Sequence, residues 1–119
     1  MNSIIDKEKN IVAYFHNLMI IDAIEENVIG IVIGDCIFGS SKEPVGKLFN
    51  NTFWHLNGEK MALLEEEILH IETIKLNEKT LIIDAWEILN NIQNHTCKWI
   101  VEKNNWHQNE FLFLLQYEK

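Results

Sequence analysis

The side chains most able to bind a metal ion or act as a nucleophile are five histidines and two cysteines. His95 and Cys97 are two residues apart, so on a strand they would share a face, and Cys36 or His70 could complete a tetrahedral zinc site. The chain nevertheless contains no C-x-x-C, H-E-x-x-H or H-x-x-x-H spacing. We therefore expect structural cysteines, surface histidines, no bound metal and no cofactor.

A cysteine and a histidine could also form a nucleophilic pair, because the two need only meet in space. Cys36 lies in the most hydrophobic run of the chain, where burial makes a thiol unreactive. The sequence has no glycine-rich phosphate loop, no G-x-S-x-G turn and no kinase signature. It thus predicts no catalytic residue and favours a protein that is not an enzyme.

Acidic and aromatic residues form the remaining candidate site. Glu65, Glu66 and Glu67 are consecutive, so their carboxylates point in different directions and cannot converge unaided on one cation. Trp106 and His107 lie in a polar loop, where a tryptophan is typical of a binding surface. These five residues predict a partner-binding surface on which the carboxylates steer the partner and Trp106 anchors it.

The charge balance favours a basic protein as that partner. The chain has 18 acidic and 10 basic residues, a formal net charge of -8, and no arginine. Binders of nucleic acid usually carry a stripe of lysine and arginine, so we expect no nucleic-acid partner. A negative field accelerates the approach of a basic protein.

Length and composition predict one domain. A chain of 119 residues with 47% hydrophobic residues is large enough to bury one core, so we expect a single globular domain over residues 1–119. The first ten residues do not resemble a secretory signal, and no apolar run reaches the ~18 residues that span a bilayer. We expect a cytoplasmic protein without membrane contact, in which Cys36 and Cys97 are reduced.

Two turn-forming pairs organise the middle of the chain. Asn50-Asn51 and Asn57-Gly58 readily adopt positive φ, as the tight turns between antiparallel strands require. They predict three short antiparallel strands over residues 45–49, 52–56 and 59–63.

A two-residue type I′ turn at Asn57-Gly58 also predicts the register of the second hairpin. Trp54 would then pair with Met61, and Phe53 with Ala62. In this arrangement we expect the Trp54 side chain to lie in the core.

The other apolar segments are less uniquely patterned. Residues 27–39 form a nearly continuous β-branched run, which predicts a buried strand bent at Gly30 and Gly34. Residues 11–24 have helical spacing at their start, so we expect a helix there, and their second half fits helix or strand. Residues 65–80 fit either a helix or a hairpin.

The last part of the chain predicts one helix and one hairpin. Asp84 is suited to cap a helix over residues 85–93, with Trp86 on its buried stripe. Residues 97–103 alternate between two faces and residues 110–118 are apolar, so we expect these segments to pair as a terminal hairpin. The fold class predicted by all these elements is α+β: a mainly antiparallel meander or hairpin sheet packed with one to three helices.

The function that these features favour is that of a small, acidic, cytosolic protein-binding module. In size, acidity and aromatic loops the chain is similar in type to bacterial immunity proteins, which neutralise a cognate toxin, although no residue motif assigns it to such a family. We therefore expect an inhibitor of a basic partner such as a toxin.

Two alternatives remain open. One is a small-ligand protein or enzyme with a pocket between sheet and helix, lined by His70, His95, Cys97 or Trp54. The other is a subunit of an oligomeric assembly, including a homo-oligomer, that pairs through an exposed edge at FLFLLQY.

Overall fold

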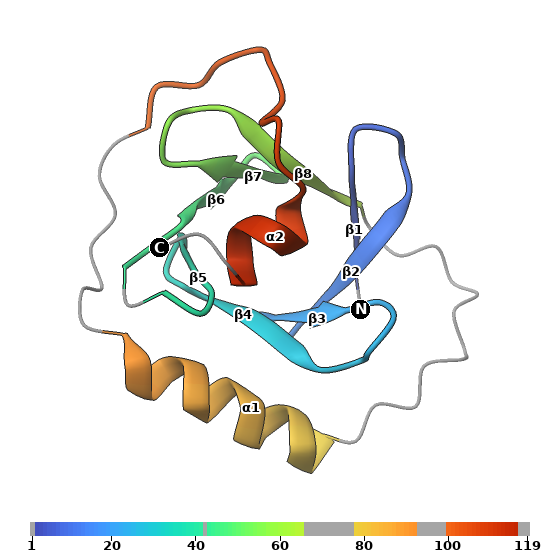
Figure 1. Cartoon of the computed structure of the whole chain (residues 1–119), viewed down its shortest axis with the longest axis vertical. Coiled ribbons are helices and arrows are strands. Elements are labelled where there is room, and N and C mark those ends of the chain that lie inside the picture. Colours follow the sequence, from blue (N-terminus) through green and yellow to red (C-terminus); the bar gives the residue numbers. More distant parts are fainter. Residues whose placement is uncertain (1, 42, 66–77, 93–99, 117–119) are drawn as a thin grey trace.

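The computed structural model describes residues 2–41, 43–65, 78–92 and 100–116 (Figure 1). Within them, eight antiparallel strands follow one another in chain order around a closed barrel. The strands are β1 (Asn2–Ile5), β2 (Ile11–His16), β3 (Met19–Asp22), β4 (Val28–Ile33), β5 (Cys36–Phe38), β6 (Gly46–Phe49), β7 (Thr52–His55) and β8 (Lys60–Glu65). Two helices accompany the barrel, α1 (Glu78–Asn91) and α2 (Phe111–Gln116).

Closure of the barrel shows that the expected α+β fold is wrong. The last strand, β8, pairs with the first, β1, so that Ile4 lies opposite Leu64 and Ile5 opposite Leu63. This contact joins strands that are far apart in the sequence, and no local turn signals it. The protein is therefore a barrel of strands with two short helices, and not a sheet packed with one to three helices.

Strands β2 and β3 form a hairpin over the segment whose first half was expected to be helical. His16 pairs with Met19 across a two-residue turn, Asn17-Leu18, in which φ is 49° and 65°. Positive φ at both central residues is the geometry of a type I′ turn, which matches the twist of the flanking strands. The helical spacing near Ile11 was thus misleading, because β-branched residues there also suit a strand.

The run at residues 27–39 is two strands, β4 and β5, and not one bent strand. Gly34, with a φ of 62°, lies in the turn that reverses the chain, so that Ile31 pairs with Phe38 and Ile33 with Cys36. Strands β3 to β5 have core residues on both faces, one set inside the barrel and the other beneath α1. Burial on both faces explains why these strands lack an alternation of apolar and polar residues.

The three central strands are confirmed as an antiparallel meander, β6 to β8. Phe53 pairs with Ala62 as predicted, but a β-bulge follows and places Trp54 opposite Lys60 in place of Met61. The hairpin therefore has the predicted strands with one predicted pair displaced.

Trp54 lies opposite Lys60 because the loop has three residues, 56–58, in place of two, and the bulge at Met61 restores the predicted pairing at Phe53. The Gly58 N–H donates to the His55 carbonyl (2.8 Å), and the His55 N–H donates to the Glu59 carbonyl (2.8 Å). Only Gly58, with a φ of 94°, has positive φ within this loop. This is the three-residue hairpin in which a glycine ends a type I turn and forms a bulge opposite His55, separate from the one at Met61.

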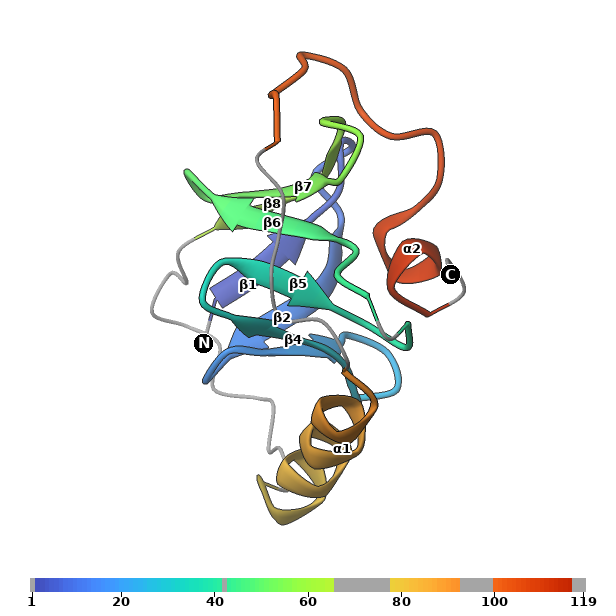
Figure 2. The ribbon, with the colours of Figure 1, turned by 90° about the vertical axis from the view of Figure 1, so that its left-hand side faces the viewer.

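Side chains fill the barrel, and α2 covers one of its mouths (Figures 1 and 2). Phe111, Leu114 and Leu115 of α2 are buried among the inward-facing strand residues. Ser40 holds the end of the helix: its N–H donates to the Leu115 carbonyl (2.8 Å) and its hydroxyl to the Gln116 carbonyl (2.6 Å). The core around them consists of Ile4, Ala13, Ile20, Ile29, Val32, Ile37, Val45, Phe53, Met61 and Ala62.

The expected terminal hairpin is wrong for the part that the structure describes. Residues 111–116 are helical, and residues 100–103 belong to no strand, while residues 97–99 and 117–118 lie outside the described ranges. A short, continuously apolar run fits a helix as well as a strand, so its pattern could not decide between them.

Helix α1 packs on the outside of the barrel against β4. Leu81 is 1% exposed and lies in a second core with Met19, Ile31 and Phe38. The helix begins at Glu78, so Asp84 lies inside it and cannot cap it, and Trp86, expected in the core, is 57% exposed. Among the described helices, none is long and apolar enough to cross a membrane.

Candidate partner-binding groove

The structure places the residues of the predicted acidic and aromatic surface at two ends of one strand. Glu65 is exposed at the end of β8, and Glu66 and Glu67 lie outside the described residues. Trp106 forms a bridge with Lys60 at the start of β8. A strand rises about 3.3 Å per residue, so these two positions are roughly 17 Å apart. The structure therefore does not bring Trp106 next to Glu65.

Trp106 and His107 are half-buried and held by the β7–β8 hairpin. The His107 N–H donates to the Lys60 carbonyl (2.8 Å), and the Lys60 N–H donates to the Asn105 carbonyl (3.1 Å). The His107 ring lies 4.6 Å from the His55 ring, centroid to centroid. The two residues also line a cleft of about 260 Å³ between the β1–β2 turn and residues 106–112.

The histidine and cysteine sites considered from the sequence have no structural support among the described residues, where no three His, Cys, Asp or Glu side chains are grouped to hold a metal. His70, His95 and Cys97 lie outside those ranges. Cys36 is disulfide-bonded and 5% exposed. The expected reduced thiol at Cys36 is therefore wrong, because that expectation rested only on a cytoplasmic location.

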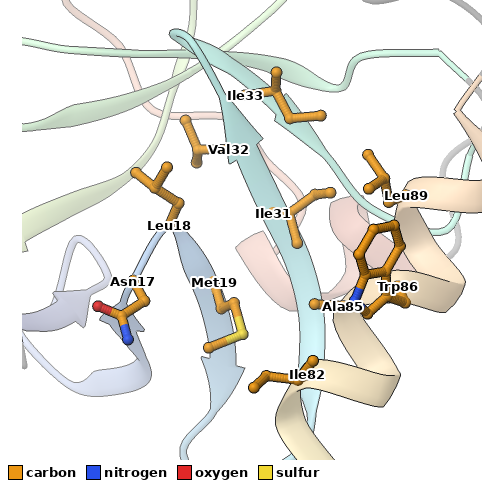
Figure 3. Close-up of a pocket in the computed structure, with 10 residues that line it drawn as sticks. All are labelled: Asn17, Leu18, Met19, Ile31, Val32, Ile33, Ile82, Ala85, Trp86 and Leu89. Atoms are coloured by element: carbon orange, nitrogen blue, oxygen red, sulfur yellow. The ribbon is translucent and has the colours of Figure 1, made fainter.

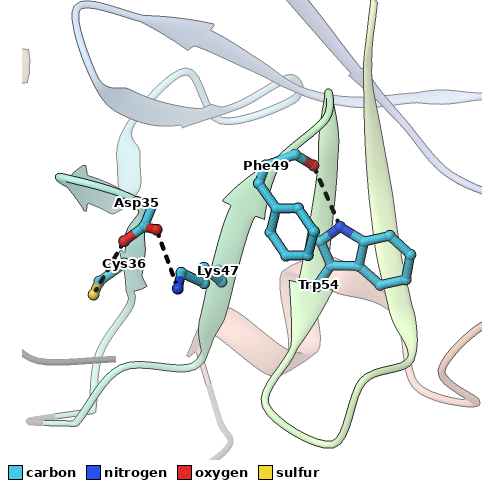
Figure 4. A network of polar contacts seen from close by, with 5 residues as sticks. All are labelled: Asp35, Cys36, Lys47, Phe49 and Trp54. Atoms are coloured by element: carbon cyan, nitrogen blue, oxygen red, sulfur yellow. Dashed lines mark hydrogen bonds and ion pairs between the residues drawn. The ribbon is translucent and has the colours of Figure 1, made fainter. Parts of the chain in front are cut away.

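Polar contacts around Cys36 and Trp54 tie neighbouring strands together (Figure 4). The Lys47 Nζ lies 3.2 Å from the Asp35 carboxylate, and the Cys36 Sγ lies 3.9 Å from the other oxygen of that carboxylate. A disulfide sulfur carries no proton, so the second contact is not a hydrogen bond. Since these groups hold the turn between β4 and β5 against β6, they are structural.

Trp54 is a core residue, as expected, and does not line a ligand pocket. It is 5% exposed, its indole N–H donates to the Phe49 carbonyl (3.3 Å), and its ring stacks on Phe49 with centroids 5.4 Å apart (Figure 4).

A groove of about 310 Å³ lies between α1 and the strands β3 and β4, on the outside of the barrel (Figure 3). We call it the α1 groove. In Figure 3, Leu18 in the β2–β3 turn and Trp86 on α1 lie on opposite sides of β4. The residues that line it are Asn17, Leu18, Met19, Ile31, Val32, Ile33, Ile82, Ala85, Trp86 and Leu89.

Large apolar side chains in this groove are open to solvent. Leu18 and Trp86 are each 57% exposed, and Ile82 is 49% exposed. Ile83, the next residue on α1, is 60% exposed. Contiguous exposed apolar surface is costly in water and marks interaction sites in stable proteins.

The groove offers almost no polar chemistry. Among the described residues that line it, Asn17 is the one polar residue, and its amide nitrogen lies 3.2 Å from Nε2 of His16, within hydrogen-bonding distance. No charged side chain is part of the lining among the residues that the structure describes. The described lining of the α1 groove is therefore suited to binding by apolar contact.

The charged residues within the segments that line the α1 groove are acidic, and Lys79 lies outside these segments, in the first turn of α1. Throughout residues 17–35 and 81–90, which include the groove-lining segments, no lysine occurs. Asp35 is compensated by Lys47 of β6. The other charged residues of these segments are Asp22, Glu25, Glu26, Asp84 and Glu87.

Sequence reasoning missed the α1 groove, although one signal was present. Residues 81–89, LIIDAWEIL, place apolar side chains around more of the helix than the single stripe needed to cover a barrel. The surplus residues, Ile82, Ile83 and Trp86, are the exposed ones. No protein-family model, no curated protein and no solved structure matches the chain.

Proposed function

We propose that this protein is an acidic binding module whose α1 groove receives an apolar segment of a basic partner protein. The observation that carries the proposal is the exposure of Leu18, Ile82 and Trp86 around a groove without charged lining. Tryptophan is the residue most enriched at the energetic centres of protein interfaces, and such centres are apolar with a polar rim.

Charge decides what kind of partner fits. The chain segments that line the groove, residues 17–35 and 81–90, contain acidic residues and no lysine, and the whole chain has a formal net charge of -8. A second copy in a two-fold interface would bring these carboxylates against one another, because such an interface uses the same patch twice. A basic partner would instead be attracted during approach and retained by the apolar contacts.

A small ligand is less well supported than a protein. Small-molecule sites combine an apolar cavity with a few converging polar groups that fix the ligand's orientation. In the part of the lining that the structure describes, the only polar residue is Asn17, which already has His16 as a neighbour within hydrogen-bonding distance. The photocrosslinking experiment described below distinguishes the proposed partner from the two alternatives, a small ligand and a second copy of the chain.

Within this class, we favour an inhibitor of the immunity type, which masks a basic protein such as a toxin. Size and acidity support this narrower assignment. The predicted surface at Glu65 to Glu67, Trp106 and His107 remains a second candidate contact area, and variants there separate it from the α1 groove.

Site-specific photocrosslinking combined with capture from a lysate of the source organism tests the proposal. A benzoylphenylalanine replaces Trp86, and in a matched control it replaces Phe113, an apolar residue of α2 that is 48% exposed and does not line the groove. We expect one basic protein to crosslink at position 86 and not at position 113. Its capture should weaken at high salt and on Trp86→Ala.

Three results would overturn the proposal. One is crosslinking at position 86 only to a second copy of the chain. Another is unchanged capture of the same protein by Trp86→Ala. The third is loss of capture on Trp106→Ala with none on Trp86→Ala, which would move the interface to the surface predicted from the sequence.

A further inference from the structure

The β2–β3 turn contains a residue type that its backbone geometry disfavours. Leu18 has a φ of 65°, in the left-handed region, at the second central position of the turn. There the Cβ of an L-residue lies too close to the following carbonyl oxygen, and glycine or asparagine is the usual occupant. Leucine at this position therefore destabilises the fold relative to either of them.

Other turns of the same chain use the favoured residues. Asn50-Asn51 joins β6 to β7 with φ values of 52° and 56°, and Gly34 and Gly58 occupy positive-φ positions in two more turns. The first position of the β2–β3 turn is likewise an asparagine, Asn17. Lys9 (φ 67°) and Glu26 (φ 59°) also have positive φ, but both are charged, so among the described residues Leu18 is the one apolar side chain at such a position.

Packing does not account for the exception. More than half of the Leu18 side chain is exposed, so its burial recovers little of the cost. The tertiary hydrogen bond at this residue, from the Val32 N–H to the Leu18 carbonyl (2.9 Å), uses only the backbone. Glycine or asparagine would make the same bond.

The position of the Leu18 side chain explains why leucine is kept in this turn. Leu18 lines the α1 groove, and in Figure 3 it lies across β4 from Trp86. The two residues come from separate elements, a tight turn and a helix, that are both fixed to the barrel. A rigid turn holds an apolar side chain in place before a partner arrives, which lowers the entropy lost on binding.

We infer that Leu18 is a specificity-determining residue of the α1 groove, retained in a left-handed turn at the expense of folding stability. It forms the wall that faces Trp86 and selects a partner with an apolar side chain of matching shape. The inference rests on the proposed function, since it names a determinant of that same site.

The test compares alanine and glycine at two positions. Leu18→Ala and Leu18→Gly remove the same side chain, but only glycine relieves the left-handed strain. Lys9→Ala and Lys9→Gly form the matched control, because Lys9 has a φ of 67° in the β1–β2 turn and does not line the α1 groove. In both pairs we expect the glycine variant to melt about 4 °C higher than the alanine variant.

Binding is measured with two probes, the uncharged apolar dye Nile red and the protein captured by the wild-type chain. Both Leu18 variants should bind each probe at least about fivefold more weakly than wild type, and the Lys9 variants should bind as wild type does. If Leu18→Gly melts no higher than Leu18→Ala, the claim that a side chain at position 18 strains this turn is wrong. Wild-type affinity for both probes in both Leu18 variants would overturn the role in binding.

The same experiment separates this inference from the proposed function. If Trp86→Ala abolishes capture while the Leu18 variants keep full affinity for both probes, the function stands and Leu18 has no part in it. If the Leu18 variants lose the dye but Trp86→Ala leaves capture unchanged, the groove is confirmed and the partner binds elsewhere.

Discussion

Leu18 and Trp86 line the same groove although one belongs to a β-turn near the start of the chain and the other to a helix on the outside of the barrel. Each is 57% exposed. Their juxtaposition depends on α1 packing against β4, so the groove exists only once the helix is in place on the barrel.

Trp86 should be dispensable for folding. We expect Trp86→Ala to lower the free energy of unfolding by about 1 kcal/mol or less, because the side chain is largely open to solvent. Trp54→Ala, at a position that is 5% exposed, should cost about 3 to 5 kcal/mol. Urea denaturation of the two variants measures both values. Equal losses would mean that Trp86 belongs to the core.

The helical state of α2 predicts which of its side chains matter. Leu114→Ala should cost about 3 kcal/mol, since Leu114 is fully buried in the mouth of the barrel, and Phe113→Ala about 1 kcal/mol or less. In a strand, Phe111, Phe113 and Leu115 would instead share one face. Thermal or urea unfolding that showed Phe113→Ala to be as damaging as Leu115→Ala would therefore contradict the helix.

Two glycines should differ sharply in their tolerance of alanine. A Cβ on Gly39 would lie 2.1 Å from the Leu115 carbonyl oxygen, so Gly39→Ala must push α2 away from the barrel. We expect it to lower the unfolding free energy by more than about 3 kcal/mol. Gly34→Ala meets no atom within 4 Å and should cost only the strain of its positive φ, about 1 kcal/mol. Circular dichroism melts of both variants decide the matter, and similar melting temperatures would argue against the close contact at Gly39.

The disulfide at Cys36 should contribute to stability. Such bonds typically add about 2 to 4 kcal/mol, so dithiothreitol should lower the melting temperature of the wild-type protein. Cys36→Ala should melt at that lower temperature with or without reductant. Alkylation of both cysteines in the unreduced, denatured protein would show that the bond does not form.

The parts of the fold that depend on local turn chemistry were predictable from the sequence. Asn50-Asn51 correctly marked the β6–β7 turn, and Gly58 correctly marked a turn between β7 and β8. The β2–β3 turn was missed because Leu18 is a residue that local preferences exclude from it. Residue preferences of β-turns cannot predict a turn that contains a disfavoured residue.

Non-local features were beyond the reach of pattern reasoning. The pairing of β1 with β8 leaves no local signal in the sequence. Without this pairing, the strand pattern predicts an open sheet. The run FLFLLQ has no alternation to separate helix from strand, and its state follows from the space available in the barrel mouth. The candidate site was equally hidden, because Trp86 reads as a core residue until the exposure of its helix face is known.

The seam between the first and last strands also sets the order in which the protein can be built. On the ribosome, the strand that pairs with β1, which is β8, is made only after the six strands β2 to β7 have been synthesised. Contacts of such long sequence separation slow folding. Helix α2 is synthesised later still. The apolar interior at this mouth of the barrel therefore stays uncovered until residues 111–116 leave the ribosome.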